Sequence, residues 1–273
     1  MSRYTDPDYL KQQYGDAANL SARIRLHQLF NTNPQELQHW AFDRMLKDAP
    51  PRCRILELGC GNGEFWRKNA GRIPTGWQIT VSDFSAGMLA DAQKSLAGLA
   101  TKFDFRGIDA QNIPCDDQSF DLVMAHFMLY HVPNRAQAIA EIRRILKPDG
   151  CLHAMTLGAN HLRELHELAH QIAPEVFPTR DAVSRTFGLE NGVDQLLTSF
   201  GEVTLIRYDC DLEITELAPL VDYVLSMARI DPDDERLLSF RTTAQARLDQ
   251  DGRIHIAKDT GLLVARGYAG VRP

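Results

Sequence analysis

ILELGCGNGEF, from Ile55 to Phe65, is the most informative segment of this 273-residue sequence. Its short apolar first half predicts a strand at residues 54–58. Glycines at alternate positions then allow a tight turn and let a ligand lie against the backbone without interference from a Cβ. A dinucleotide-binding turn places its third glycine one residue later and receives a pyrophosphate at the following helix. Here Glu57 precedes the turn, where a carboxylate would repel a pyrophosphate but suit a cation.

Strands and helices alternate after this segment. Strands are predicted at residues 54–58, 78–82, 103–108, 120–125 and 151–156, and two later ones at 202–212 and 255–266. Helices are predicted at residues 8–30, 35–47, 85–99, 135–146, 161–172, 180–186, 193–200, 217–227 and 234–248. Alternation at this spacing favours an α/β fold with a mostly parallel sheet built from right-handed crossovers. We divide the chain into an N-terminal helical arm or lid (1–50), an α/β core (51–157), a helical cap (158–200) and C-terminal strands with a helical insert (201–273).

Acidic residues follow the second and third predicted strands. Asp83 comes 20 residues after Gly63, where an acid can accept hydrogen bonds from both hydroxyls of a ribose. Asp109 could accept from an exocyclic adenine amine, and the backbone N–H of Ala110 could serve a ring nitrogen. Together with the turn, these residues predict a pocket for adenine and ribose without phosphate, with carboxylates close to a positive group.

Five segments in this order resemble the class I S-adenosylmethionine-dependent methyltransferases, of the small-molecule type. They are ELGCGNG (57–63), VSDFS (81–85), GIDAQNIP (107–114), FDLVMAHFMLYHVP (120–133) and EIRRILKPDG (141–150), and the resemblance covers roughly residues 52–156. It implies a Rossmann-like, seven-stranded, mostly parallel sheet with helices on both faces and an antiparallel last strand. The implied donor is S-adenosyl-L-methionine, which leaves as S-adenosyl-L-homocysteine.

The resemblance also implies roles for individual residues. Gly59, Gly61 and Gly63 would lie along the methionine moiety, Asp83 would hold the ribose, Phe84 would flank the adenine, and Asp109 and Ala110 would read its edge. Ala125 and His126, at the end of the fourth strand, would lie near the sulfonium. The remaining expected donor contacts are Glu57, Met88, Tyr14 and Arg23, with Arg23 pairing to the donor carboxylate.

Methyl transfer from a sulfonium is an in-line displacement, so a general base matters only when the acceptor must lose a proton. The candidate bases are His126 and His131, for which packing or a backbone hydrogen bond is the competing interpretation. Tyr130, His161 and Glu164 are candidates for the acceptor pocket. The acceptor atom (oxygen, nitrogen or carbon) is left open.

The segment HELAH, residues 166–170, suggests a different chemistry. His166 and His170 lie one helical turn apart beside Glu167, the spacing of a zinc hydrolase. However, no recognised pattern supplies a third ligand, and we expect no metal. A zinc hydrolase and a non-catalytic cofactor-binding module remain as alternatives to the methyltransferase.

Composition limits the partners. The net charge is −6, and the segment after the fourth strand lacks the N/D/S-P-P-aromatic pattern of enzymes that methylate nucleic-acid amines, so we expect a small-molecule acceptor and no nucleic acid. The five cysteines are odd in number and form no CxxC, which indicates reduced thiols and a cytoplasmic location. No run of about 18 apolar residues predicts a membrane span. We expect a monomer or a homodimer.

Overall fold

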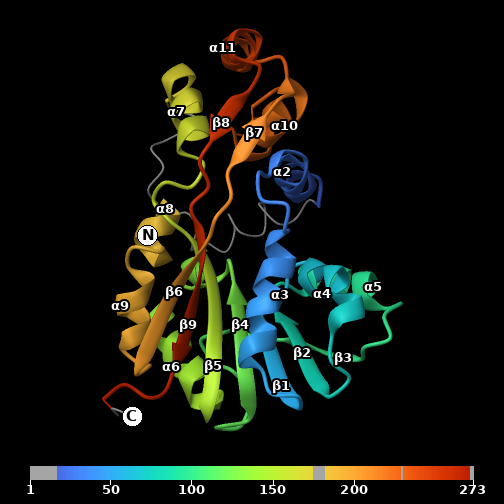
Figure 1. Ribbon diagram of the computed structural model, residues 1–273, viewed down its shortest axis with the longest axis vertical. Helices are drawn as coiled ribbons and strands as arrows, with labels where there is room; N and C mark the ends of the chain where they lie inside the picture. The colour runs from blue at the N-terminus through green and yellow to red at the C-terminus, as the bar shows by residue number, and fades with distance from the viewer. Residues whose placement is uncertain (1–16, 175–181, 229, 271–273) are drawn as a thin grey trace.

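The computed structural model describes residues 17–174, 182–228 and 230–270 (Figure 1). Its main sheet has the strand order β3-β2-β1-β4-β5-β9-β6. The strands are β1 (Cys53–Leu58), β2 (Trp77–Asp83), β3 (Phe103–Gly107), β4 (Phe120–His126), β5 (Leu146–Leu157), β6 (Glu202–Tyr208) and β9 (Thr260–Arg266). Only β9 runs antiparallel to its neighbours β5 and β6. The predicted seven-stranded, mostly parallel α/β fold is therefore confirmed.

Helices cover both faces of the sheet because the central strands are apolar on both sides. Ile55 and Leu122 pack with α3 (Leu37–Asp48), α4 (Glu64–Lys68) and α5 (Ala86–Leu96). Leu56 and Val123 point to the opposite face, against α6 (Arg135–Ile145), α8 (Ala182–Phe187) and α9 (Gly192–Leu197). Ile55 pairs with Leu122 and Leu56 with Val123, which places the carboxyl ends of β1 and β4 side by side.

A third apolar cluster forms a separate layer, which we call the cap. It contains α2 (Ala17–Phe30), α7 (Arg163–Ile172), α10 (Leu217–Ala228), α11 (Glu235–Asp251) and the antiparallel pair β7 (Leu212–Ile214) and β8 (Ile254–Ile256). Figure 1 shows the cap beyond the end of the sheet at which β1 turns into α4. The cap therefore faces the carboxyl ends of the parallel strands.

The two late strands differ from the prediction. Residues 202–212 and 255–266 were each expected to form one strand, but each is divided between the main sheet and the cap hairpin. The interruptions lie at polar links, where the backbone N–H of Asp211 donates to Thr32 Oγ1 at 2.8 Å and that of Lys258 donates to Asp211 Oδ1 at 2.9 Å. These side-chain acceptors take the place of ladder partners as the chain leaves the sheet.

The domain boundaries stay a prediction, although the segments we proposed contribute to more than one layer. In residues 158–200, α7 packs in the cap while α8 and α9 pack on the sheet. In residues 1–50, α2 packs in the cap and α3 on the sheet. All five cysteines are free thiols. Within the described ranges, the helices are too short or too polar to cross a membrane.

Candidate functional site

The glycine turn joins β1 to α4, and its three glycines have different neighbours. Gly59, Gly61 and Gly63 have φ angles of 74°, 56° and 77°, in the left-handed region that glycine enters most readily. A Cβ on Gly59 would lie 2.8 Å from Met128 Cβ, and one on Gly63 would lie 3.1 Å from Leu96. A Cβ on Gly61 would meet no atom of the described residues within 4 Å. Gly59 and Gly63 therefore serve the fold, whereas Gly61 borders open space.

Asp83 ends β2 beside this turn. Its Oδ2 accepts from the backbone N–H of Gly61 at 2.9 Å, and its Oδ1 accepts from that of Ser85 at 2.8 Å. Burial raises the pKa of Asp83, and the backbone hydrogen bonds oppose that shift. The next residue, Phe84, has 78% of its surface exposed, which is unusual for so large an apolar side chain. A carboxylate, an open turn and an uncovered ring thus lie together at one edge of the sheet.

Glu57 lies just below the turn on β1 and is 3% exposed. Its Oε2 accepts from Trp66 Nε1 at 2.7 Å. Burial raises the pKa of Glu57 to about 8; the Trp66 hydrogen bond lowers it, and the negative charge of Asp83 raises it further. Two acidic groups with raised pKa therefore flank the turn, and a positively charged ligand would favour their ionised forms.

The carboxyl end of β4 has a strained backbone. Phe127 has a φ of 56°, a left-handed conformation that is uncommon for an aromatic residue and often found at functional sites. The preceding Ala125 is fully buried. His126 packs its ring edge-to-face on Phe65 with centroids 5.3 Å apart, and its buried Nε2 has no hydrogen-bond partner among the described residues. Burial lowers the pKa of His126 to about 3, with a smaller contribution from His153, so its imidazole is neutral at physiological pH.

The end of β3 joins the same edge. The backbone N–H of Ile108 donates to the carbonyl of Asp83 at 3.3 Å, which places Asp109 and Ala110 next to the end of β2. Asp109 Oδ1 accepts from the backbone N–H of Gln111 at 2.9 Å, and Ala110 is buried. Met88 is also buried, in the first turn of α5, and its backbone N–H donates to the capping Ser85 Oγ at 3.4 Å.

Other predicted site residues lie elsewhere. Arg23 belongs to the cap, where its Nε donates to Ser226 Oγ at 3.1 Å and its Nη2 to the Ser226 carbonyl at 2.9 Å. Glu164 Oε2 accepts from the backbone N–H of Ala257 at 2.8 Å, so it ties α7 to the segment after β8. Tyr14 lies outside the described residues.

The remaining pocket candidates follow the sheet edge. Tyr130 and His131 belong to a 3-10 turn, η3 (Leu129–His131), directly after β4, and their rings are 4.5 Å apart. Tyr130 is buried and His131 half-buried. His161, in the link between β5 and α7, accepts at Nδ1 from the backbone N–H of Asp259 at 3.3 Å. His161 therefore lies at the junction of sheet and cap, whereas His131 lies just beyond the carboxyl end of β4.

The HELAH residues lie on α7, within the cap. Leu165, Leu168 and Ala169 form the buried side of this helix, and Glu167 is exposed, with an oxygen 3.9 Å from Arg163. In the described part of the chain, His166 and His170 do not belong to a group of three potential metal ligands. Sequence reasoning missed Trp66 and Met128; the aromatic pair that follows the glycine turn was the available signal for Trp66.

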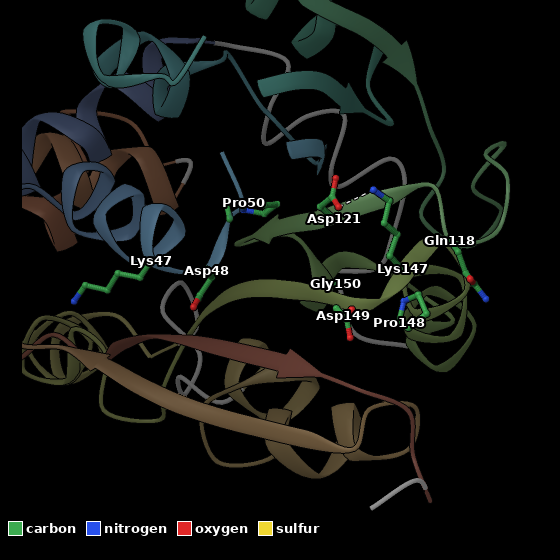
Figure 2. Close-up of a pocket in the computed structure, with 10 residues that line it drawn as sticks. Lys47, Asp48, Pro50, Gln118, Asp121, Lys147, Pro148, Asp149 and Gly150 are labelled. Carbon is green, nitrogen blue, oxygen red and sulfur yellow. Dashed lines mark hydrogen bonds and ion pairs between the residues drawn. The ribbon is translucent and has the colours of Figure 1, made fainter. Parts of the chain in front are cut away.

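A hollow of about 670 Å³ lies at the opposite edge of the sheet, near the amino ends of β1, β4 and β5 (Figure 2). Asp121 and Lys147 form an ion pair of 2.7 Å on its wall. Ligands of open α/β sheets bind outside the carboxyl ends of the strands, so this hollow is not the place for a nucleoside.

Comparison with known proteins agrees with the geometry. Residues 56–154 match the family described as a methyltransferase domain. The chain is 33% identical over 137 residues to the malonyl-[acyl-carrier protein] O-methyltransferase of Enterobacter lignolyticus, covering 48% of this chain and 51% of that protein. It is 33% identical over 114 residues to the demethylmenaquinone methyltransferase of Lactiplantibacillus plantarum, covering 41% and 48%. The chain thus spans about half the length of these curated relatives.

The fold is shared more widely than the sequence. The crystal structure of a candidate methyltransferase from Bacillus halodurans matches with a TM-score of 0.56 at 15% identity, covering 85% of this chain and 99% of that one. At this identity the likeness shows the fold alone. The family match over residues 56–154, the strand order and the turn geometry together support a domain of the class I S-adenosylmethionine-dependent methyltransferase type in this part of the chain.

Proposed function

We propose that this chain transfers a methyl group from S-adenosyl-L-methionine to a small-molecule acceptor. The open space beside Gly61 is the observation that carries this proposal, because a ligand can lie there against the backbone. Asp83 stands next to it, able to accept from ribose hydroxyls, and the exposed ring of Phe84 offers a surface on which adenine can stack. The residues present therefore fit a phosphate-free nucleoside.

The charges at the turn fit the rest of the donor. The bound donor supplies a methyl group already activated on a positively charged sulfur. Glu57 and Asp83 lie close enough for the charge of one to raise the pKa of the other, so a cation nearby relieves their repulsion. The chain's own contribution is then to hold the reacting groups in line and to exclude water.

We propose that His126 acts on the methyl acceptor when the acceptor carries a proton that must leave. Its ring is neutral, and its Nε2 has no hydrogen-bond partner in the described part of the structure. A neutral imidazole nitrogen can accept a hydrogen bond from an acceptor group, although the low pKa makes it a weak base. We therefore propose that His126 accepts a hydrogen bond that orients the methyl acceptor. His131 is the second candidate for this role.

The relatives' names support a small-molecule or carrier-bound acceptor, and we extend that class to this chain as part of the proposal. The cap faces the strand ends that hold the donor, which supports an acceptor site between cap and sheet. The net charge of −6 supports the absence of a nucleic-acid partner. Five free thiols support a cytoplasmic setting. We retain a monomer or homodimer as the proposed assembly.

Calorimetric titration with S-adenosylhomocysteine tests the donor site directly. Wild-type protein should bind it, and Asp83→Asn should weaken binding roughly 10- to 100-fold, the equivalent of about 1.5–3 kcal/mol for a hydrogen bond to a charged group. Asp116→Asn is the matched control, because Asp116 is an exposed carboxylate in the link between β3 and β4. A wild-type protein indifferent to this product, or equal affinities for Asp83→Asn and the control, would refute the proposal.

A second experiment identifies the acceptor. Metabolite extracts would be incubated with the protein and donor labelled on the methyl group, and labelled products would be identified by mass. The proposal predicts a labelled small molecule that disappears with Asp83→Asn and persists with Asp116→Asn.

A further inference from the structure

A group of potential metal ligands lies away from the glycine turn. Asp48, Cys151 and His153 bring a carboxylate oxygen, a sulfur and a ring nitrogen within 4.8 Å of one another, the one such group of three among the described residues. Cys151 and His153 are two positions apart on β5, so they point to the same face of the sheet. Asp48 is the last residue of α3, which covers that face. We propose that these three side chains bind a zinc ion.

The kinds of ligand favour zinc over other common ions. Zinc binds sulfur, imidazole nitrogen and carboxylate oxygen, whereas calcium and magnesium take mostly oxygen ligands. Cys151 and His153 are each 1% exposed and lie within an otherwise apolar cluster. Burial of a polar ring at this depth is unfavourable unless it has a partner, and the group supplies one in Asp48.

Two of the proposed ligand atoms are already in direct contact. His153 Nε2 and Asp48 Oδ2 are 2.8 Å apart. Two ligands of a tetrahedral zinc ion at about 2.0–2.1 Å are roughly 3.4 Å from each other, so this pair must open by roughly 0.6 Å. Zinc takes the place of the hydrogen between His153 Nε2 and Asp48 and of the hydrogen of the Cys151 thiol. The neutral imidazole keeps one proton, on Nδ1, and the thiol proton leaves to solvent. No oxidant or other reactant is needed.

Arg266 acts on the same carboxylate from the other side. Its Nη2 donates to Asp48 Oδ1 at 2.6 Å, which leaves Oδ2 for the metal. Hydrogen bonds of this kind orient a metal-binding carboxylate. A thiolate and a carboxylate neutralise the charge of the ion, so Arg266 keeps its own pairing with Asp48. The competing arrangement is an ion-pair network in which Arg266 and His153 alone satisfy Asp48.

The site has an entry path. The side chain of Asp48 is 23% exposed and lies on the wall of the 670 Å³ hollow, beside Lys47 and Pro50 (Figure 2). Water in this hollow can supply a fourth ligand, which gives three protein ligands and one exchangeable position. Cys151 pairs with Leu122 and His153 with Met124, so the group lies along the middle of β5, on the face that α3 covers.

Metal binding by the full chain tests the inference without any measurement of methyl transfer. Protein prepared without a metal-binding tag would be titrated with zinc against a chromophoric chelator. The wild type should bind one equivalent of zinc. Cys151→Ala should bind zinc at least roughly 10- to 100-fold more weakly, because removing a metal ligand weakens binding more than removing a residue that only hydrogen-bonds a ligand. Cys53→Ala is the matched control, because Cys53 is 2% exposed in the same apolar cluster but is not one of the three ligands.

Cobalt gives a second readout. A cobalt-loaded wild type should show sulfur-to-cobalt charge-transfer absorption that survives Cys53→Ala and is lost in Cys151→Ala. If Cys151→Ala fails to fold, Asp48→Asn replaces it, since Asp48 lies at the rim. A folded wild type that binds no zinc in competition with the chelator would establish the ion-pair network and overturn the proposal, as would equal zinc affinity in wild type and Cys151→Ala. Neither outcome bears on S-adenosylhomocysteine binding.

Discussion

Substituting Gly61 by alanine separates ligand binding by the glycine turn from its structural role. A left-handed residue with a side chain is destabilised by about 1–2 kcal/mol relative to glycine. The same change stabilises the protein by about 0.4–1 kcal/mol through a less flexible unfolded chain. A Cβ on Gly61 meets no described atom within 4 Å, so no steric term is added. We therefore expect Gly61→Ala to lower the free energy of unfolding by only about 1 kcal/mol.

The neighbouring glycine gives the contrasting case. A Cβ on Gly59 would lie 2.8 Å from Met128 Cβ, and overpacking of this kind adds about 1–3 kcal/mol. Gly59→Ala should thus lower the free energy of unfolding by about 2–4 kcal/mol in total. Gly252 is the matched control, with a φ of 70° at the end of α11 and open surroundings where the structure is described, so Gly252→Ala should resemble Gly61→Ala in stability.

Two assays complete the comparison. Urea unfolding followed by circular dichroism measures stability, and calorimetric titration measures affinity for S-adenosylhomocysteine. Gly61→Ala should lose roughly 10- to 100-fold in affinity because its methyl group occupies space that the ligand needs, whereas Gly252→Ala should bind as the wild type does. Wild-type affinity in Gly61→Ala, or an equal loss in Gly252→Ala, would refute the assignment of the open space to the donor.

Three further predictions follow from burial and position. Burial raises the pKa of Glu57 from 4.5 to about 8, so its contribution to the free energy of unfolding is full below pH 4.5 and is lost as the pH rises through 8. Urea unfolding measured across this pH range should therefore show a smaller decline in the free energy of unfolding for Glu57→Gln than for the wild type. Because burial lowers the pKa of His126 from 6.5 to about 3, its contribution is present above pH 6.5 and is lost as the pH falls toward 3; His126→Leu should reduce the acid-induced drop in Tm. Alanine at His166 or His170 should leave the affinity for S-adenosylhomocysteine unchanged in calorimetry, and a loss comparable to that of Asp83→Asn would contradict the placement of α7 in the cap.

The position of the glycine turn and of the acidic residue beside it could be predicted because local sequence carries both. The spacing of Gly59, Gly61 and Gly63 is visible in the sequence, and so is the distance from the turn to Asp83. Which glycine borders open space is not visible, because Met128 and Leu96 reach the turn through tertiary packing. Local sequence thus predicts where the chain turns, and the fold decides which turn positions a ligand can reach.

The divided strands were missed for a related reason. Alternating apolar residues predict a strand but do not say which sheet it joins, so a segment that passes from the main sheet into the cap hairpin reads as one strand. The polar links at residues 209–211 and 257–259 were the available signal. The meeting of Asp48 and His153 could not be predicted either, because 105 positions separate them and only the packing of α3 on β5 brings them together.

The links between sheet and cap constrain which parts of the proposed acceptor site can be exchanged. Hydrogen bonds continue past the paired ends of β5 and β9: Gly158 N–H donates to the Asp259 carbonyl, and Leu162 N–H to the Ala257 carbonyl, each at 2.8 Å. Glu164 then accepts from the N–H of Ala257 at 2.8 Å. The cap is therefore held to the sheet by hydrogen bonds between the segment that leaves β5 and the segment that enters β9. An exchange of cap elements must preserve residues 157–164 and 256–260, because the hydrogen bonds that join the cap to the ends of β5 and β9 lie in these segments.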